Sequence, residues 1–387
     1  MIYFDNAATS GVKPKSVINA VNTALSQYSV NPGRGGYELS GKCNEIIYNC
    51  RKEVASFFGA KDTTSVIFTQ NCTQAINYVL KGVLKPSDHI IVSSLEHNAV
   101  MRPLYELSKT GVSVDAAEVI FGDIDATARA FANLIKPNTK MIFCTHASNV
   151  LGNVLPIKKI GEICKEKGIL FGVDAAQTAG VLEIDMQKMN IDYLCIAAHK
   201  GLYSPMGTGI LISDKPIPKT ILEGGTGTDS IIARQPLDMP ERFESGTVNV
   251  PGIFGIKAGL EFVKQRGVDE IYKKELEMSK KCYMMLSQIG GVILYTDLPE
   301  YGRFVPTLSF NLRDYNSMEL AEILGEKGVC VRAGLHCCPS AHRRIGTLQK
   351  GTVRVSFSSY NKPEEVVTFC NMVRIVAQGK KKSKYFY

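Results

Sequence analysis

Short runs of apolar residues alternate with helix-like stretches between about residues 15 and 215. Each run is rich in β-branched or aromatic residues and is bounded by polar residues, glycine or proline, which is typical of a β-strand. The predicted strands cover residues 66–69, 89–93, 140–145, 169–173, 192–197 and 209–212. The predicted helices among them include residues 43–58, 73–84, 125–135 and 157–167.

These strands are almost continuously hydrophobic, which favours strands that are covered on both faces. Strands that alternate with helices indicate a mainly parallel sheet with helices on both sides. We therefore expect an α/β fold in which a large domain, residues 15–250, is built around this sheet.

The pattern changes after about residue 215. A loop rich in glycine and threonine is followed by a long helical stretch that starts near Pro251 and is interrupted at Gly267. Further strands are predicted at 292–295, 307–312 and 352–357 and one ending near Arg332, with helices at 317–327 and from Pro363. This mixture predicts a smaller α+β domain made of residues 1–14 and 251–387, with a basic and aromatic tail at 379–387.

The composition is that of an ordinary globular protein of 387 residues, 45% hydrophobic and 21% charged. No apolar run approaches the ~20 residues that a membrane span needs, and the first residues do not resemble a signal peptide. Four tail lysines supply half of the net charge of +8: Lys380, Lys381, Lys382 and Lys384. We therefore expect a cytoplasmic protein that binds neither membranes nor nucleic acid.

Eleven cysteines are scattered from Cys43 to Cys370, and no C-x-x-C pair occurs. The paired ligand spacing of a zinc site is missing, so no metal site is predicted. Several cysteines, such as Cys144 and Cys195, stand in apolar surroundings and are expected to be small core residues. An odd number of scattered cysteines indicates a reducing compartment.

Two charged residues follow predicted strands, at the position where α/β proteins bind ligands. Lys200 follows the strand 192–197, and a partly desolvated lysine can form a Schiff base with an aldehyde cofactor. Asp174 follows the strand 169–173, and a carboxylate there can pair with a protonated pyridine nitrogen. Taken alone, Lys200 is more typical of a surface lysine, and Asp174 is equally typical of a helix N-cap.

Three further polar groups also follow strands. The loop that ends at Thr73 opens a helix, so its N–H groups and hydroxyl can bind a phosphate, with simple helix capping as the alternative. His97 can stack on an aromatic cofactor and relay protons, although a lone histidine is more often structural. Asn149 can donate a hydrogen bond to a ring oxygen of the same cofactor.

In this order and spacing, the groups resemble those of the class V aminotransferase-fold enzymes, specifically the cysteine desulfurase and selenocysteine lyase family. The matching stretches are YFDNAATS, the Thr73 loop, EHNA, HASNVLG, VDAAQ, the HK pair, FESGTVN, RAGLHC and VRVSFSSYN, from residue 3 to residue 361. The resemblance implies the fold type I of enzymes that depend on pyridoxal 5′-phosphate (PLP). This fold has a large domain with a mainly parallel seven-stranded sheet between helices, and a smaller α+β C-terminal domain.

The resemblance also implies the residues that bind the cofactor. Lys200 would carry PLP covalently, Asp174 would hold the pyridine nitrogen, and His97 would stack on the ring and take part in catalysis. Gln177 and Asn149 would bind the ring oxygen, and the phosphate would be bound by Cys72 (through its backbone), Thr73 and His199. Thr247 would reach the phosphate held by a partner subunit, which implies a homodimer.

The same resemblance implies a substrate site. Arg354 would bind the substrate carboxylate through two parallel hydrogen bonds, and Arg332, Asn149 and Ala8 are also expected there. One departure concerns Ala197, which stands where the family usually has a Ser or Thr that binds the phosphate. The lost hydroxyl contact corresponds to ~1 kcal/mol.

The segment 332–337, RAGLHC, resembles the RxGxHC signature of the short-loop, group II branch of the family. It places Cys337 at the position of the cysteine that forms a persulfide. Nearby cations favour a thiolate, and Arg332 and His336 are both close in sequence. The alternative is that Cys337 is a packed or surface thiol. We expect Cys338 to be inert or accessory, with a resolving thiol or a second sulfur carrier as alternatives.

The implied activity converts L-cysteine to L-alanine and passes the sulfur, through a Cys337 persulfide, to an acceptor that is expected to be a protein. Iron–sulfur assembly, tRNA thiolation and selenium delivery all remain open as destinations. The alternatives are a selenocysteine lyase acting on L-selenocysteine, an aminotransferase or epimerase of the same fold, and a non-catalytic scaffold or sulfur-relay partner that has lost PLP.

Overall fold

The computed structural model describes residues 1–33, 35–228 and 230–379 and divides them into two compact units. The larger unit comprises Val12–His146 and Leu155–Val268. The smaller unit comprises Met1–Gly11, Ala147–Val154 and the chain from Asp269 onward. Of the predicted tail at 379–387, all but Gly379 lies outside the described residues.

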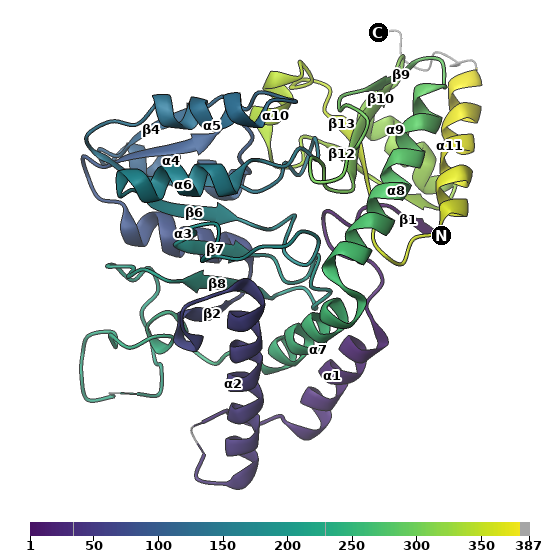
Figure 1. Cartoon of the computed structure of the whole chain (residues 1–387). Helices are drawn as coiled ribbons and strands as arrows, with labels where there is room; N and C mark the ends of the chain where they lie inside the picture. The colour runs from purple at the N-terminus through teal and green to yellow at the C-terminus, as the bar shows by residue number, and fades with distance from the viewer. Residues whose placement is uncertain (34, 229, 380–387) are drawn as a thin grey trace, which may run out of the picture. The chain divides into compact units, whose positions relative to one another are not determined.

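The larger unit is built on one sheet, which has seven strands among the described residues (Figure 1). Their order across the sheet is β2-β8-β7-β6-β5-β3-β4. In chain order they are β2 Val66–Thr69, β3 His89–Ser93, β4 Ser113–Ala117, β5 Thr139–Thr145, β6 Leu170–Asp174, β7 Tyr193–Ile196 and β8 Gly209–Ser213. Strand β8 runs antiparallel to both β2 and β7, and the other strands of this sheet share one direction.

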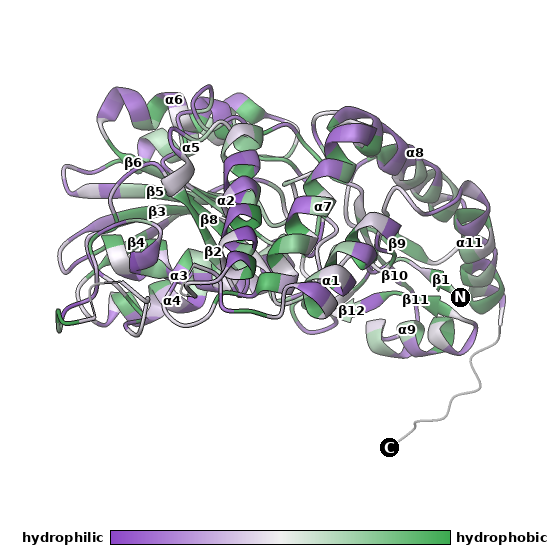
Figure 2. Cartoon of the chain, turned by 90° about the horizontal axis from the view of Figure 1, so that it is seen from below, coloured by the Kyte–Doolittle hydropathy of each residue, from purple (hydrophilic) through white to green (hydrophobic). Residues whose placement is uncertain are grey.

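The helices of the larger unit pack against this sheet or against one another, and those on the sheet bury its apolar side chains. They are α1 Lys15–Gln27, α2 Glu38–Phe58, α3 Cys72–Val83, α4 Asn98–Ser108, α5 Ile124–Asn133, α6 Ile157–Lys167 and α7 Val250–Arg266, with short 3-10 turns η1 Thr63–Ser65 and η2 Glu241–Phe243. Ile76 and Val79 of α3 join Ile90, Phe143 and Leu211 of the strands in one buried core. Figure 2 shows hydrophobic residues along β3 and β8 and hydrophilic residues on α2 and α6.

Polar side chains fix the starts of helices in the larger unit. Asn71 accepts a hydrogen bond of 2.9 Å from the Gln74 amide at the start of α3, and Asn249 accepts one of 3.0 Å from the Gly252 amide at the start of α7. Both caps satisfy backbone N–H groups that have no partner within the helix. At the other end, Gly59 terminates α2 in the left-handed conformation that glycine adopts without strain.

The smaller unit contains an antiparallel sheet with the order β12-β13-β10-β9 and, among the described residues, a separate parallel pair, β1 with β11. These strands are β1 Ile2–Tyr3, β9 Val292–Leu294, β10 Thr307–Leu312, β11 Val329–Cys330, β12 Arg332–Gly334 and β13 Thr352–Ser356. The helices are α8 Val268–Ser287, α9 Ser317–Glu326, α10 Pro339–Arg344 and α11 Pro363–Gln378. The core of this unit includes Phe4, whose ring packs edge-on against Phe357 and Phe369.

The hydrophobic pattern predicted most of these strands within an α/β fold, and the resemblance implied the class V fold; the α/β fold and the class V family are confirmed. The pattern missed β4, whose sequence SVDAA contains a partly exposed aspartate because β4 is an edge strand with β3 as its one neighbour. The compact units also differ from the predicted domain limits. Helix α7 lies in the larger unit because it packs against α1 and α2, and Ala147–Val154 lies in the smaller unit.

No helix in the described part of the chain combines the length and apolar character that a membrane span requires.

Candidate active site

Most of the polar groups predicted to bind the cofactor follow strands of common direction in the larger unit. Carboxyl ends of parallel strands meet at one edge of a sheet, where α/β proteins bind ligands. Cys72 and Thr73 follow β2, His97 follows β3, Asp174 ends β6 and is followed by Gln177, and His199 and Lys200 follow β7. The topology therefore brings these predicted residues to the same edge.

A direct contact joins two of these strand ends. The Cys72 thiol lies 3.5 Å from Oδ1 of Asp174, and both side chains are buried. The same oxygen accepts a hydrogen bond of 2.9 Å from the Ala176 amide. Burial, together with the Asp174 carboxylate, raises the pKa of Cys72 well above its ordinary value, so this cysteine stays a neutral thiol. Asp174 is thus a buried carboxylate at the end of a central strand.

The N-terminus of α3 has the features of an anion site. Asn71 caps the helix, and Thr73 in the first turn is exposed. Gly209 of β8 packs so closely that a Cβ atom there would lie 2.4 Å from the carbonyl carbon of Asn71. The backbone of this loop therefore packs closely against β8, and it lies at a helix N-terminus, as phosphate-binding loops do.

His97 is fixed in orientation by the start of α4. Its Nδ1 accepts a hydrogen bond of 3.0 Å from the Ala99 amide, so the ring proton of the neutral form is on Nε2. The preceding residue, Glu96, is buried, and its Oε1 accepts hydrogen bonds from the amides of Ser93 and Thr145 at 3.2 and 2.8 Å. Glu96 thereby joins the end of β3 to the end of β5, next to His97 in the chain. Burial raises the pKa of Glu96 to about 8.

Lys200 lies in a tight turn after β7. Its amide donates to the Ala197 carbonyl at 3.1 Å, and its carbonyl accepts from the Tyr203 amide at 2.9 Å. Lys13 donates a hydrogen bond of 2.9 Å to the carbonyl oxygen of His199. Burial and the nearby lysines Lys200 and Lys13 lower the pKa of His199 to about 4, so this imidazole is neutral and can act as a hydrogen-bond donor but not as a cation.

Thr247 is exposed, on a segment that is anchored to β2 through Glu244. Arg51 and Glu244 form a two-point ion pair of 2.8 and 2.9 Å, with both side chains 8% exposed. Oε1 of Glu244 also accepts a hydrogen bond of 2.7 Å from the Phe68 amide. The loop that carries Thr247 is therefore fixed close to its start.

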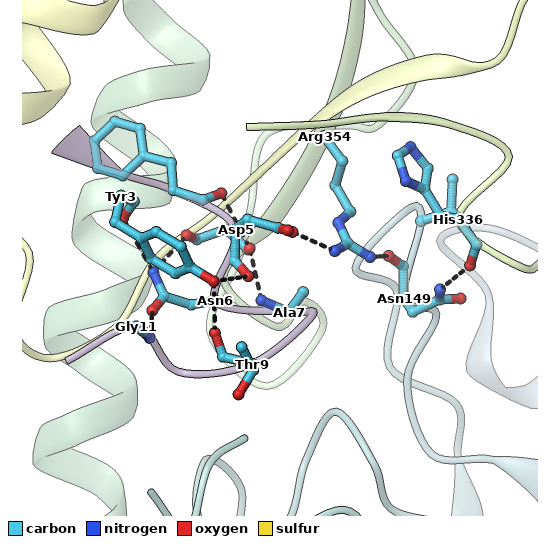
Figure 3. Close-up of polar contacts among 12 residues, drawn as sticks. Tyr3, Asp5, Asn6, Ala7, Thr9, Gly11, Asn149, His336 and Arg354 are labelled. Atoms are coloured by element: carbon cyan, nitrogen blue, oxygen red, sulfur yellow. Dashed lines mark hydrogen bonds and ion pairs between the residues drawn. The ribbon is translucent and has the colours of Figure 1, made fainter. Parts of the chain in front are cut away.

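In the smaller unit, the predicted substrate residue Arg354 is buried within a polar chain (Figure 3). Its Nη2 lies 2.8 Å from Oδ1 of Asp5, and its Nη1 donates to the Asn149 carbonyl at 3.0 Å. The Asn149 side-chain amide donates in turn to the His336 carbonyl at 2.7 Å. Arg354 thus already holds one carboxylate of the protein itself.

Cys337 is the exposed tip of a turn between β12 and α10. The Cys338 amide donates to the Leu335 carbonyl at 2.9 Å, and both central residues have positive φ, +49° for His336 and +57° for Cys337. This conformation costs a residue other than glycine about 1–2 kcal/mol. Cys338 is buried, with its sulfur 3.6 Å from Oγ of Ser340.

The expected contribution of His336 to a Cys337 thiolate is wrong. His336 is buried and its Nε2 contacts the Thr352 carbonyl at 3.0 Å. Burial, with the charge of Arg354 and the neighbouring His342, lowers the pKa of His336 to about 2. A neutral imidazole supplies no positive charge at physiological pH, so proximity in sequence was misleading. Arg332 lies on β12 directly opposite Arg354 of β13.

The remaining predicted substrate residue, Ala8, lies in the turn that follows β1, with its amide 3.1 Å from the Asp5 carbonyl. Sequence analysis gave no role to Asp5, Lys13 or Glu96. Asp5 and Glu96 stand inside the matched stretches YFDNAATS and EHNA, which was the available signal. Lys13 carries no such signal, because only the fold brings it to His199.

This set of side chains fits PLP. A buried carboxylate suits a pyridinium nitrogen, a helix N-terminus suits a phosphate, and a lysine at a strand end suits an aldehyde. In the larger unit these are provided by Asp174, the start of α3 and Lys200.

The fold and these residues define a class of protein. The profile of the aminotransferase class-V family matches residues 2–369, and the chain belongs to this family of enzymes.

Within the family, several similar proteins are named cysteine desulfurases or probable cysteine desulfurases. The probable cysteine desulfurase of Methanothermobacter thermautotrophicus is 32% identical over 94% of this chain and 92% of its own length. That of Pyrococcus abyssi is 32% identical over 99% of this chain and 96% of its own. The apo structure of cysteine desulfurase from Thermococcus onnurineus superposes with a TM-score of 0.88 at 31% identity, covering 98% of this chain and 95% of that chain.

Proposed function

We propose that this protein is a PLP-dependent cysteine desulfurase, which converts L-cysteine to L-alanine and transfers the sulfur through a persulfide on Cys337. The observation that carries the proposal is the exposed Cys337 at the tip of a turn whose flanking residues, His336 and Cys338, are both buried. The names of relatives that match almost the full chain support the same activity. The expected acceptor of the sulfur is another protein with a reactive thiol.

In this proposal Lys200 would hold PLP through its amine, and Asp174 would face the pyridine nitrogen. The α3 start with Cys72 and Thr73, together with neutral His199, would bind the phosphate. Gln177, Asn149 and His97 would contact the ring. When bound, PLP accepts the electron pair released at the substrate Cα, which weakens the Cβ–S bond.

The side chains then have separate tasks. The Lys200 amine, once displaced by the substrate amine, accepts the Cα proton. The neutral His97, with its Nε2 proton held in place by the bond at Nδ1, exchanges a proton with the substrate thiol. The thiolate of Cys337 attacks the substrate sulfur: a S–S bond forms, the Cβ–S bond breaks, and its electron pair returns to Cβ, which takes a proton to give alanine.

Cys337→Ala tests the proposal. The variant should lose persulfide, detected as a mass increase of one sulfur on the peptide that contains residue 337, and should release alanine from L-cysteine far more slowly. Cys330→Ala is the matched control, since Cys330 is the other cysteine that is not buried in the described chain. Full alanine release by Cys337→Ala would refute the persulfide route, and selective turnover of L-selenocysteine would indicate a lyase.

We also propose a cytoplasmic homodimer. All eleven cysteines lie in described residues and are free, as expected in a reducing compartment. Apolar side chains in the part of the chain that precedes Thr247 are exposed, including Ile231 and Leu237, and a partner subunit would cover such residues. Sedimentation at several concentrations, with Ile231→Lys as the variant, would test the assembly. A wild-type monomer at all concentrations would refute it.

A further inference from the structure

The turn that presents Cys337 has an unusual backbone for its sequence. Residues 335–338 form a hydrogen-bonded turn in which both central residues have positive φ. Turns of this kind favour glycine, asparagine or aspartate at the central positions. Here these positions hold histidine and cysteine, so contacts from outside the turn must maintain its shape.

Asn149 makes one of these contacts. Its Nδ2 donates to the His336 carbonyl at 2.7 Å, and that carbonyl belongs to the peptide bond that leads into Cys337. A hydrogen bond to this oxygen fixes the plane of the peptide and therefore the direction of the Cys337 Cα–Cβ bond. The ring of His336 is held separately, with its Nε2 3.0 Å from the Thr352 carbonyl oxygen.

Asn149 is itself held firmly. Its carbonyl accepts a hydrogen bond of 3.0 Å from Arg354, which is paired with Asp5. The next residue, Val150, accepts a hydrogen bond of 2.7 Å at its carbonyl from buried Ser309. Figure 3 shows the continuous chain from Asp5 through Arg354 and Asn149 to His336. The amide of Asn149 therefore acts from a fixed support.

We propose that Asn149 is a positioning residue for Cys337, which keeps the 335–338 turn in its left-handed conformation and so directs the thiol. This role rests on the proposed function in one respect: Cys337 is the cysteine that reacts. It differs from the contact with a cofactor ring that the sequence suggested, because the hydrogen bond acts on the backbone of the Cys337 turn. The Asn149 side-chain amide has two N–H groups, so one can donate to the His336 carbonyl while the other contacts a ring oxygen.

Asn149→Asp and Asn149→Ala test the inference by removing the donor. The readout is hydrogen–deuterium exchange of the peptide covering residues 334–340, measured on the full-length protein as purified. The Cys338 amide, which donates to Leu335, should exchange about tenfold faster in both variants. Persulfide formation on Cys337 should fall by a similar factor. Alkylation of Cys337 by iodoacetamide should stay within about twofold, because that reaction needs only an exposed thiol.

Tyr272→Phe is the matched control. It removes another buried side-chain donor of the smaller unit, whose hydroxyl donates to the Phe304 carbonyl at 2.7 Å, and should leave exchange at 334–340 unchanged. Wild-type protein stripped of cofactor should also keep slow exchange.

Two outcomes would overturn the role of Asn149: unchanged exchange in the folded Asn149 variants, or equally fast exchange in the stripped wild type. Failure of the desulfurase proposal would appear separately, as alanine release that survives Cys337→Ala.

Discussion

The side-chain amine of Lys13 donates a hydrogen bond of 2.9 Å to the carbonyl oxygen of His199, the residue that precedes Lys200. The segment before α1 is thus tied to the turn that carries the proposed cofactor lysine. Burial lowers the pKa of Lys13 to about 8. The contact therefore places a partly desolvated amine at the residue that precedes Lys200. Because its pKa is lowered in the folded protein, Lys13 should have a measurable effect on the free energy of unfolding.

Lys13→Met should change how the free energy of unfolding depends on pH. The folded pKa of about 8 lies below the ordinary value of 10.5, so the unfolded chain binds more protons between these pH values. Wild-type stability should therefore rise relative to Lys13→Met as the pH increases from 8 to 10. We expect the free energy of unfolding of the wild type to rise by about 1 kcal/mol relative to that of Lys13→Met, a value discounted for the partial exposure of Lys13. Urea unfolding at a series of pH values measures it; a constant difference would contradict the burial of this amine.

Gly259→Ala should disturb the turn that contains Lys200, because Gly259 packs against Leu202 of that turn. A Cβ atom at Gly259 in α7 would lie 1.9 Å from the Leu202 carbonyl oxygen, so either the helix or the turn must move. We expect a loss of about 1–3 kcal/mol in the free energy of unfolding and weaker retention of PLP. Denaturant unfolding and PLP absorbance are the measurements. Gly41→Ala in α2, where nothing lies within 4 Å of the added Cβ, should not destabilise the protein.

Glu244→Gln should be strongly destabilising. The substitution leaves the Arg51 guanidinium, 8% exposed, without its carboxylate partner. Removing one member of a buried ion pair typically costs about 3–5 kcal/mol. Chemical denaturation should show such a loss, whereas Glu241→Gln, three residues earlier, should have little effect. If the Arg51→Met/Glu244→Leu double variant were less stable than Glu244→Gln, the cost would not come from the unpaired charge.

In the His146→Gln variant, the free energy of unfolding should fall less than in the wild type as the pH is lowered. Burial lowers the pKa of His146 to about 3, below its ordinary 6.5, so the unfolded chain binds more protons between these values. The stability associated with neutral His146 is present above pH 6.5 and is lost as the pH falls toward 3. Between pH 6.5 and 5 the wild type should lose about 2 kcal/mol more than His146→Gln. Equal losses in denaturant titrations would show that His146 titrates normally.

Much of this protein could be predicted from the order of its residues. Strands 66–69, 89–93 and 307–312 agree with β2, β3 and β10 at both ends, because uninterrupted β-branched and aromatic runs bounded by polar residues are a local signal. Lys200, Asp174 and His97 could be singled out since each comes at or shortly after the end of such a run. Their common edge then follows from parallel strand direction.

Other features were decided by tertiary structure. The charge of His336 depends on burial beside Thr352 and Arg354, which no neighbour in sequence reveals. The pairing of Arg354 with Asp5 joins residues 349 positions apart, and the bond from Asn149 to His336 joins residues 187 apart. The local sequence determines which backbone conformation each segment prefers and which chemical groups its side chains carry. Protonation, hydrogen-bond partners and the support of the Cys337 turn depend on which distant groups the fold brings together and excludes from water.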